Sequence, residues 1–328
     1  MLEKNDVYAL QLIKYLGPKK IENLTEAYSD INDIISASED ELNQYIKGAG
    51  KDSIISEIKN NFDKYLETAD YDFEQFEYHG ITLISKSCEE YPNSLRVIDK
   101  SPPFLYCKGN TNLLKEKNSI AVIGSRNATI GGYEIAYETT RQFLENDYNI
   151  VSGLASGIDT AGHTAAVNFK KKTTAVLVAI DTIYPKENQV LSDSIIDFGG
   201  LLITENKPGT PITGPLFVER DRLQSALSKA VFAIETDIKG GTLHTVSFAE
   251  KQKKKIYCPN LREEQLYKKY IGNPMSKGID MLIQSGRAIP YSTDKLDKVI
   301  KEVDKLRIEG DITVQPKASE GRQQILYD

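Results

Sequence analysis

The stretch Asn149-Ile150-Val151-Ser152-Gly153-Leu154-Ala155-Ser156-Gly157-Ile158-Asp159 decides the fold of this 328-residue chain. A short apolar run, typical of a strand, enters a turn of small residues, and a helical pattern follows directly. Residues 120–123 enter Gly124-Ser125-Arg126 in the same way. A glycine turn between a strand and a helix leaves free backbone N–H groups and the positive end of a helix dipole at one point. The two turns together predict an anion pocket.

The region around these turns alternates between apolar runs and helical patterns. Strands are predicted at 120–123, 149–151, 174–178, 201–203, 231–234 and 256–257. Helices are predicted between them at 133–146, 159–169, 187–198, 216–228 and 242–253. Strands separated by helices of this length predict an α/β fold, with a mostly parallel, doubly wound, extended Rossmann-like sheet. Ligands of such folds bind outside the carboxyl ends of the strands, where both turns lie.

The flanking regions predict three domains: a small helical domain at 1–68, the Rossmann-like domain at 69–290, which begins with a connector at 69–80, and a last helix with a tail at 291–328. Ser38 and Glu41 form a candidate capping box that opens one of the N-terminal helices. The turn Gly17-Pro18-Lys19-Lys20-Ile21 resembles a helix-hairpin-helix element, which grips DNA backbone in other proteins. A plain helical bundle that makes protein contacts is the alternative.

Charge and composition limit the class of protein. The net charge is −6. Residues 1–70 contain 8 basic and 14 acidic residues, whereas the remainder is balanced at 33 each. The neutral remainder can therefore carry a local basic patch for phosphate. The apolar runs are too short to span a membrane, the start lacks a secretory signal, and the three cysteines have no paired spacing. We expect a cytoplasmic protein without a disulfide framework or a metal site.

Several polar residues at the predicted turns and helix starts can bind phosphate. Gly124 allows close approach, Ser125 donates from its hydroxyl, and Arg126 can contact two oxygens. Asp159 lies where an N-cap opens the next helix, and a structural cap is at least as good an explanation for it as catalysis. The candidate phosphate-binding residues are Gly124, Ser125, Arg126, Ser152, Gly153, Gly157, Arg220, Arg222, Lys239, Gly241 and Thr242.

The arginine pair and the third glycine turn contribute to the predicted pocket only in part. Arg220 and Arg222 are two positions apart, so a helix places them on different faces, and only one could reach the pocket while the other pairs with an acid. Lys239, Gly241 and Thr242 belong to a third glycine turn at a helix start, another possible nest for oxygen.

Common catalytic patterns are missing from the sequence. There is no Gly-x-x-x-x-Gly-Lys-Ser/Thr loop for ATP hydrolysis, and the first turn lacks the Gly-x-Gly-x-x-Gly of nicotinamide-binding proteins. His163 and His244 are too far apart to suggest a metal site, and no nucleophile with a base and an orienting group can be chosen. We therefore expect a binding protein without cofactor or catalytic residues.

Taken in order, the motifs resemble the DNA-processing protein A (DprA) family, also called Smf. The resemblance covers about residues 80–290. It rests on Tyr91-Pro92-Asn93-Ser94-Leu95, Pro103 to Gly109, Gly124 to Thr129, Ser152 to Asp159, His163, Tyr184 to Asn188, Glu205 to Gly209, Phe217 to Ser228, and Gly278 to Ile283. The helical start is similar to the family's small leading domain.

This resemblance implies an extended Rossmann fold that binds single-stranded DNA without catalysis. It also implies a homodimer that hands DNA to a RecA-type recombinase during transformation or recombination. By position, it assigns the phosphate pocket to Gly124, Ser125, Arg126, Ser152, Gly153, Gly157, Arg220 and Arg222.

The chain departs from the family pattern at three places. Asp221 stands where the family has Asn between two arginines, Lys239-Gly240-Gly241-Thr242-Leu243 replaces a Ser-Gly-Ser-Leu-like turn, and no winged-helix tail is evident. These departures suit a divergent, defence-associated branch, and two alternatives stay open. One is a regulatory, antitoxin-like homologue in phage defence that acts through protein contacts. The other is a nucleotide hydrolase of the lysine-decarboxylase-like (LOG) type, which the partial Gly-Gly-Thr turn resembles.

Overall fold

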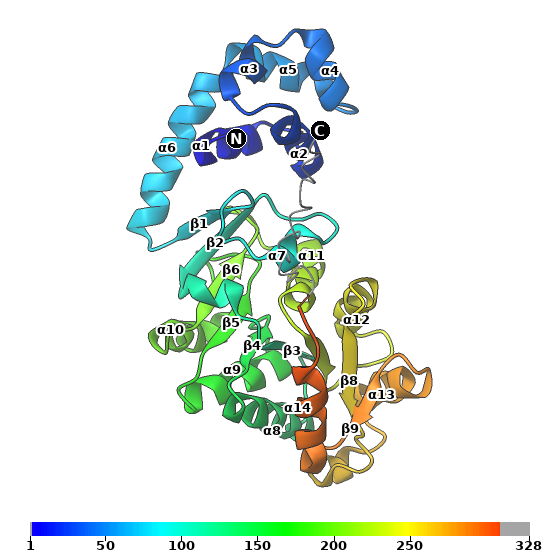
Figure 1. The fold of residues 1–328 in the computed structure, drawn as a ribbon. Helices are drawn as coiled ribbons and strands as arrows, with labels where there is room; N and C mark the ends of the chain where they lie inside the picture. Colours follow the sequence, from blue (N-terminus) through cyan, green and yellow to red (C-terminus); the bar gives the residue numbers. More distant parts are fainter. Residues whose placement is uncertain (1, 309–328) are drawn as a thin grey trace, which may run out of the picture.

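The computed structural model describes residues 2–308 and shows a helical N-terminal part above a larger α/β part (Figure 1). The N-terminal helices are α1 (Lys4–Leu12), α2 (Pro18–Ala27), α3 (Ile31–Ser36), α4 (Glu39–Tyr45), α5 (Lys51–Asn60) and α6 (Phe62–Tyr78). Helix α6 continues without a break through residue 68, where the sequence suggested a domain boundary. Most of the expected connector is therefore the second half of a helix that buries Ala69 and Phe76.

A nine-stranded sheet forms the centre of the α/β part in the order β1-β2-β6-β5-β4-β3-β7-β8-β9. The strands are β1 (Thr82–Ser85), β2 (Phe104–Gly109), β3 (Ser119–Ile123), β4 (Asn149–Ser152), β5 (Thr173–Val176), β6 (Leu201–Thr204), β7 (Ala230–Ala233), β8 (Lys255–Pro259) and β9 (Ile289–Tyr291). Among the described residues, β2 pairs antiparallel with both of its neighbours, β1 and β6, and all other pairs of neighbouring strands are parallel. The predicted mostly parallel α/β fold is confirmed.

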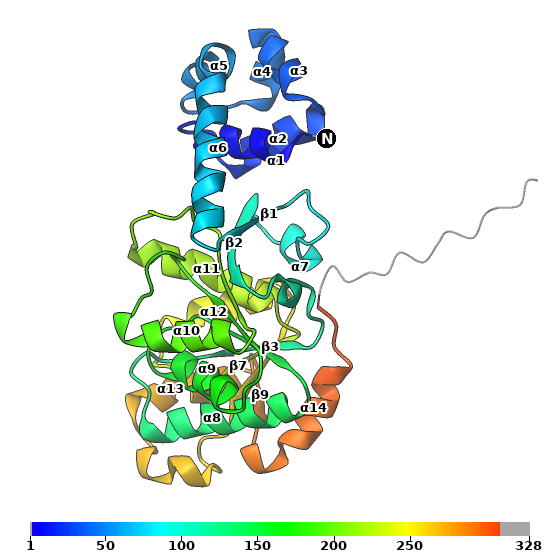
Figure 2. The same ribbon diagram turned by 90° about the vertical axis from the view of Figure 1, so that its left-hand side faces the viewer.

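Helices cover both faces of this sheet, as a doubly wound fold requires. They are α7 (Asn93–Arg96), α8 (Ile130–Glu145), α9 (Ile158–Asn168), α10 (Gln189–Asp197), α11 (Gly214–Ala226), α12 (Thr242–Lys251), α13 (Pro274–Gln284) and α14 (Leu296–Asp304). Short 3-10 turns are η1 (Thr111–Lys115), η2 (Lys186–Asn188), η3 (Gln265–Tyr270) and η4 (Thr293–Lys295). Figure 2 shows α8, α9 and α10 on one face, with α11 and α12 on the other.

The alternation of side chains along the strands produces separate cores on the two faces. Ile150 packs into the core that contains α8 and α9, whereas its neighbour Val151 packs toward α11. The same switch separates Ala175, in the core under α10, from Val176. Because successive side chains of a strand point to opposite faces, both faces of each central strand are apolar, as expected for buried parallel strands.

The N-terminal helices share a core with the antiparallel edge of the sheet. Tyr8 of α1 lies 5.6 Å, ring centre to ring centre, from Phe104 of β2, and Phe76 of α6 lies 5.4 Å from Tyr106. Asp72 of α6 accepts from the Tyr8 hydroxyl and pairs with Lys207, which follows β6. These apolar and ionic contacts attach the helical part to the sheet.

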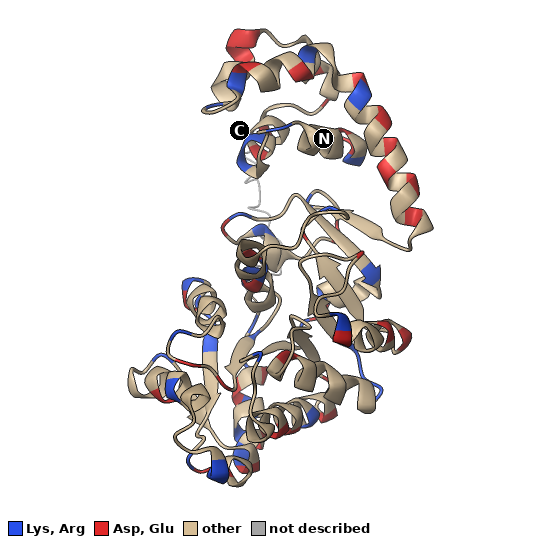
Figure 3. Cartoon of the chain, turned by 180° about the vertical axis from the view of Figure 1, so that it is seen from behind, with Lys and Arg blue, Asp and Glu red and all other residues tan. Residues whose placement is uncertain are grey.

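Helix α4 begins where its capping box predicts. The Ser38 hydroxyl accepts from the Glu41 N–H, and the Glu41 carboxylate accepts from the Ser38 N–H at 2.7 Å, which confirms the capping box. Lys20, in the suspected DNA-gripping turn, instead donates to the carbonyls of Tyr15 and Ala49. This use of its ammonium group favours a helical bundle. Figure 3 shows acidic residues distributed along the length of α6.

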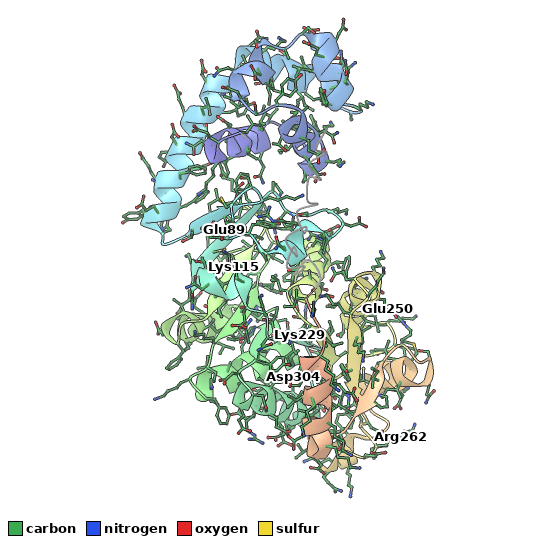
Figure 4. The ribbon with its side chains drawn as sticks, viewed as in Figure 1. Glu89, Lys115, Lys229, Glu250, Arg262 and Asp304 are labelled. Atoms are coloured by element: carbon green, nitrogen blue, oxygen red, sulfur yellow. The ribbon has the colours of Figure 1, made fainter. Side chains whose placement is uncertain are left out.

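The last helix predicted within 291–328 consists of η4 and α14. Lys229, just before β7, donates to the Asp304 carbonyl at the end of α14 and to Asn118 (Figure 4). Residues 309–328 of the expected tail lie outside the described residues. Within residues 2–308, no helix is both long enough and apolar enough to cross a membrane.

Candidate anion-binding site

A cavity of about 430 Å³ opens at the carboxyl ends of β3, β4 and β7. Five segments line it: the loop after β3, the turn after β4 with the start of α9, helix α11 from Gly214 to Gln224, the turn that leads from β7 into α12, and Met275 at the start of α13. Gly124, Ser125, Arg126, Arg220, Gly241 and Thr242, all expected at the site, line this cavity. The position follows from the fold, because strand ends at a parallel sheet edge meet helix starts there.

The glycine turns at 124–126 and 152–159 lie against each other. The Ile158 N–H donates to the Ser125 carbonyl at 3.2 Å. Gly157 has φ +80°, and a Cβ there would lie 2.3 Å from the same carbonyl oxygen. Only glycine satisfies both the left-handed backbone and this close approach. Gly157 thus shapes the wall of the site without itself lining the cavity.

The two serines of these turns have different roles. Ser125 lies at the cavity, where its hydroxyl accepts from the Asn127 N–H at 3.0 Å and contacts the Met275 sulfur. Ser152 is fully buried, and its hydroxyl donates to the Val122 carbonyl at 2.6 Å. Ser152 therefore joins β4 to β3 and does not reach the cavity.

Asp159 is not the N-cap that its position in the sequence suggested. The cap of α9 is Gly157, and Asp159 lies within the first helical turn. Its carboxylate points back and accepts from the N–H groups of Gly153 and Ala155 at 3.1 and 3.4 Å. Burial raises the pKa of Asp159, and the nearby Arg220 guanidinium opposes this rise. Asp159 therefore stabilises the conformation of the second turn and places a carboxylate at the wall of the cavity.

Arg220 is the buried cation of the site. Its side chain is 4% exposed, and its Nε lies 3.5 Å from an Asp221 oxygen. Within residues 2–308, neither Nε nor Nη1 has a hydrogen-bond partner. Gly153 leaves the room that this guanidinium occupies. Since an unsatisfied buried guanidinium is costly, an anion that enters the cavity could stabilise it.

Arg222 does not line the cavity. This agrees with the two-residue spacing, which places only one of the two arginines on the side of the cavity. Its guanidinium forms a two-bond ion pair with Glu205, with both N–O distances 2.5 Å. It also donates to the carbonyls of Lys100 and Glu219. The structure thus places Arg222 in a contact between α11 and the loop after β6.

The third glycine turn reaches the cavity only in part. Helix α12 begins at Thr242 with Gly241 as its cap, and both residues line the cavity. The first N–H groups of a helix lack partners within it, so this end presents donors and a positive dipole. Lys239 is exposed and does not belong to the cavity lining.

An aromatic wall at the cavity was not assigned from the sequence. The Arg126 guanidinium lies 4.8 Å from the centre of the Phe217 ring, and the centre of the Tyr184 ring lies 5.5 Å from the same point. The Tyr184 side chain is 53% exposed. Tyr184 belongs to the loop after β5, far from Phe217 in the sequence, and no local pattern links them.

Asp221 also lines the cavity, next to Arg220. Its Oδ1 accepts from the Gln224 side chain at 3.1 Å. Burial raises the pKa of Asp221 to about 6; Arg220 works against this rise and Asp159 adds to it. In the sequence, this acid stands out only as a departure from the family pattern. Among the described residues, no group of three or more His, Cys, Asp and Glu side chains could hold a metal ion.

Comparison with known proteins gives consistent results for sequence and fold. The family model described as DNA recombination-mediator protein A matches residues 82–304. DNA processing protein DprA of Bacillus subtilis is 29% identical over 75% of this chain and 80% of its own length. Five further relatives, called DprA or Smf, are matched over 50–64% of their length. This chain thus spans about half to two thirds of those five proteins.

Two solved structures share the fold. DNA processing protein A from Streptococcus pneumoniae superposes with a TM-score of 0.72 and 26% identity, over 91% of this chain and 98% of that one. A structure described as showing the single-stranded DNA binding mode of DNA processing protein A from Helicobacter pylori has a TM-score of 0.59 and 24% identity, over 68% and 96% of the two chains. With a family match over more than half of its residues, the chain belongs to the DNA recombination-mediator protein A (DprA/Smf) family.

Proposed function

We propose that this chain binds single-stranded DNA in the cavity between β3, β4, β7 and α11, without breaking bonds, and that it acts as a recombination mediator. The observation that carries the proposal is Arg220, a buried guanidinium with two unsatisfied nitrogens beside an open cavity. Family membership and the DNA-binding relative from H. pylori support the choice of ligand.

The chemistry of the cavity suits a single strand. Arg220 and Arg126 supply positive charge, and the start of α12 supplies backbone donors for phosphate oxygens. The ring of Phe217 and the exposed Tyr184 offer surfaces on which unpaired bases can stack. A duplex hides its bases in the stack, so these rings favour single strands.

The test is fluorescence anisotropy with a labelled single-stranded oligonucleotide and its duplex at two salt concentrations. Arg126→Ala should weaken single-strand binding by about 1–3 kcal/mol, because a charged contact is lost. The slope of log affinity against log salt concentration should become less negative by about 0.7. Arg262→Ala is the matched control, because this arginine is 68% exposed and lies outside the cavity. Binding that ignores both salt and Arg126→Ala would reject the proposal.

The mediator role adds a RecA-type recombinase as the partner, in the cytoplasm. Its test is the rate at which such a recombinase coats single strands that already carry a single-strand-binding protein. Addition of this chain should raise that rate, and the Arg126→Ala variant should raise it less. An unchanged rate, with DNA binding intact, would favour a regulatory homologue that acts through protein contacts.

We also propose a homodimer. Ile130 and Ile271 are 65% and 56% exposed, and Leu266 is 39% exposed. The segments of Ile130 and Leu266 touch, since a Cβ on Gly131 would lie 2.6 Å from the Leu266 carbonyl oxygen. Neighbouring exposed apolar side chains are typical of contact surfaces. Light scattering should give twice the chain mass, and Ile130→Asp with Ile271→Asp should give the single mass.

A nucleotide hydrolase is the second candidate, because Asp221 places a carboxylate in the cavity with a pKa near 6. General acid–base catalysis uses groups in this range. Gln224 and Arg220, however, already contact the carboxylate. Incubation with nucleoside monophosphates should release no base, and release that Asp221→Asn abolishes would favour the hydrolase.

A further inference from the structure

Two carboxylates share one buried guanidinium at the floor of the cavity. Asp221 lies 3.5 Å from the Arg220 Nε, and Asp159 interacts electrostatically with the same guanidinium from α9. Both arginine and acids are largely withdrawn from water, since Asp159 is 5% exposed and the Asp221 side chain is 15% exposed. With both acids ionised, the charge of this group is −1, which repels a phosphate.

The other elements around Asp221 supply little to offset that charge. Besides Arg220 and Asp159, the titratable groups that line the cavity with it are Arg126 after β3, Asp237 after β7 and His244 of α12. Gln224 of its own helix and Thr245 of α12 donate hydrogen bonds to it. His163 of α9 lies in the same buried cluster, but burial and Arg220 lower its pKa to about 3, so it is neutral. Arg126 is the one arginine or lysine of the described cavity lining besides Arg220.

We propose that Asp221 couples phosphate binding to proton uptake, so that its carboxyl group takes a proton from solvent when a DNA phosphate moves against Arg220. This inference rests on the proposed function, and it makes Asp221 a determinant of affinity. The protonated acid keeps its place beside Arg220 but loses the charge that opposes the phosphate. No bond within the DNA forms or breaks.

The choice of Asp221 over Asp159 follows from their contacts. Asp159 accepts two backbone N–H groups, which favour its ionised form, whereas the donors to Asp221 are the side chains of Gln224 and Thr245. Asp221 lies at the cavity surface, where a proton can arrive from water and a phosphate can approach. Burial already raises the pKa of Asp221 to about 6, and a phosphate beside it acts in the same direction as Asp159. Asparagine at 221 has the shape of the protonated acid without its charge change.

The experiment compares the unchanged protein with Asp221→Asn by anisotropy from pH 5 to pH 8.5 at constant ionic strength. The two affinities should be similar at pH 5, where Asp221 carries its proton. Above pH 6 the unchanged protein should lose up to about tenfold in affinity per pH unit more than the variant, the limit for one coupled proton. His244 is present in both proteins, so their difference isolates Asp221.

A second measurement needs no variant. Calorimetric titration at pH 7.5 in buffers of different ionisation heats should show uptake of up to one proton per bound site, and Asp221→Asn should take up less. Asp147→Asn is the control. Its side chain is 86% exposed. Asp147 precedes β4 and so lies at the amino ends of the strands, whereas the cavity lies at their carboxyl ends. It should behave as the unchanged protein does.

The outcomes separate the two ideas. Equal pH profiles for the unchanged protein and Asp221→Asn, together with equal proton uptake, would overturn the coupling but leave DNA binding intact. Failure of both proteins to bind at every pH would reject the proposed function and the coupling with it. A pH-dependent gap between them, with proton uptake in the unchanged protein, would support both.

Discussion

The guanidinium of Arg220 occupies the space where Gly153 has no side chain. A Cβ built on Gly153 would lie 1.5 Å from the Arg220 Nη1 and 2.2 Å from its Cζ. Gly153 lies in the turn after β4, and Arg220 lies in α11, far from it in the sequence. Gly153, expected to bind phosphate itself, instead leaves the space that the Arg220 guanidinium occupies.

Gly153→Ala should displace the Arg220 guanidinium, because even one methyl group overlaps it. We expect the free energy of unfolding to fall by about 1–3 kcal/mol, as for an overpacked core, and DNA affinity to fall with it. Urea unfolding and anisotropy measure the two effects. Gly162→Ala is the control, since its Cβ would find its nearest neighbour at 3.6 Å. A Gly153→Ala variant with full affinity would show that Arg220 does not bind DNA.

Arg222→Gln should affect stability and leave DNA affinity nearly unchanged. It removes one partner of a two-bond ion pair and leaves Glu205, 17% exposed, without its cation. Such a loss typically costs about 3 kcal/mol, measured by urea unfolding. Arg141→Gln breaks part-exposed ion pairs on α8 and should cost about 0–1 kcal/mol. A large loss of affinity without a loss of stability would instead place Arg222 at the DNA.

Phe217→Ala should weaken single-strand binding by about 1–3 kcal/mol, because base stacking on the ring is lost. The salt dependence should stay as it is, since no charge is removed, and this distinguishes the variant from Arg126→Ala. Anisotropy at several salt concentrations measures both quantities. Phe169→Ala removes another part-exposed ring, which packs on Tyr137 at the far end of α9, and should bind normally. Equal affinities for all three proteins would exclude stacking on Phe217.

Asp221→Asn should stabilise the free protein at neutral and alkaline pH. Since folding raises the pKa of Asp221 from 3.8 to about 6, its protonated form stabilises the fold, and that contribution is lost as pH rises from about 4 through 6. The change corresponds to about 3 kcal/mol. Urea unfolding at pH 4 and pH 8 should show the variant's relative stability rising by up to that amount. A constant difference between the two pH values would contradict this titration.

Local patterns in the sequence were sufficient for the architecture of the central sheet. The six predicted strands became β3 to β8, and the five helices between them differ by a few residues at their ends. These elements have strong signals, because buried parallel strands are apolar throughout and each turn carries glycine. The strands β1, β2 and β9 and the helix α13 lie outside this alternation of strand and helix and were not predicted.

The sequence by itself also determined that the two glycine turns lie together at the carboxyl ends of the parallel strands, and that only one arginine of the pair Arg220 and Arg222 can face them. Only the tertiary structure decided which arginine faces the cavity. Gly153 leaves room for Arg220, and Glu205 holds Arg222, from turns that the chain order separates from α11. The same holds for Asp159 and the pair Tyr184–Phe217. Such contacts depend on side chains that meet across different elements, and no local periodicity encodes them.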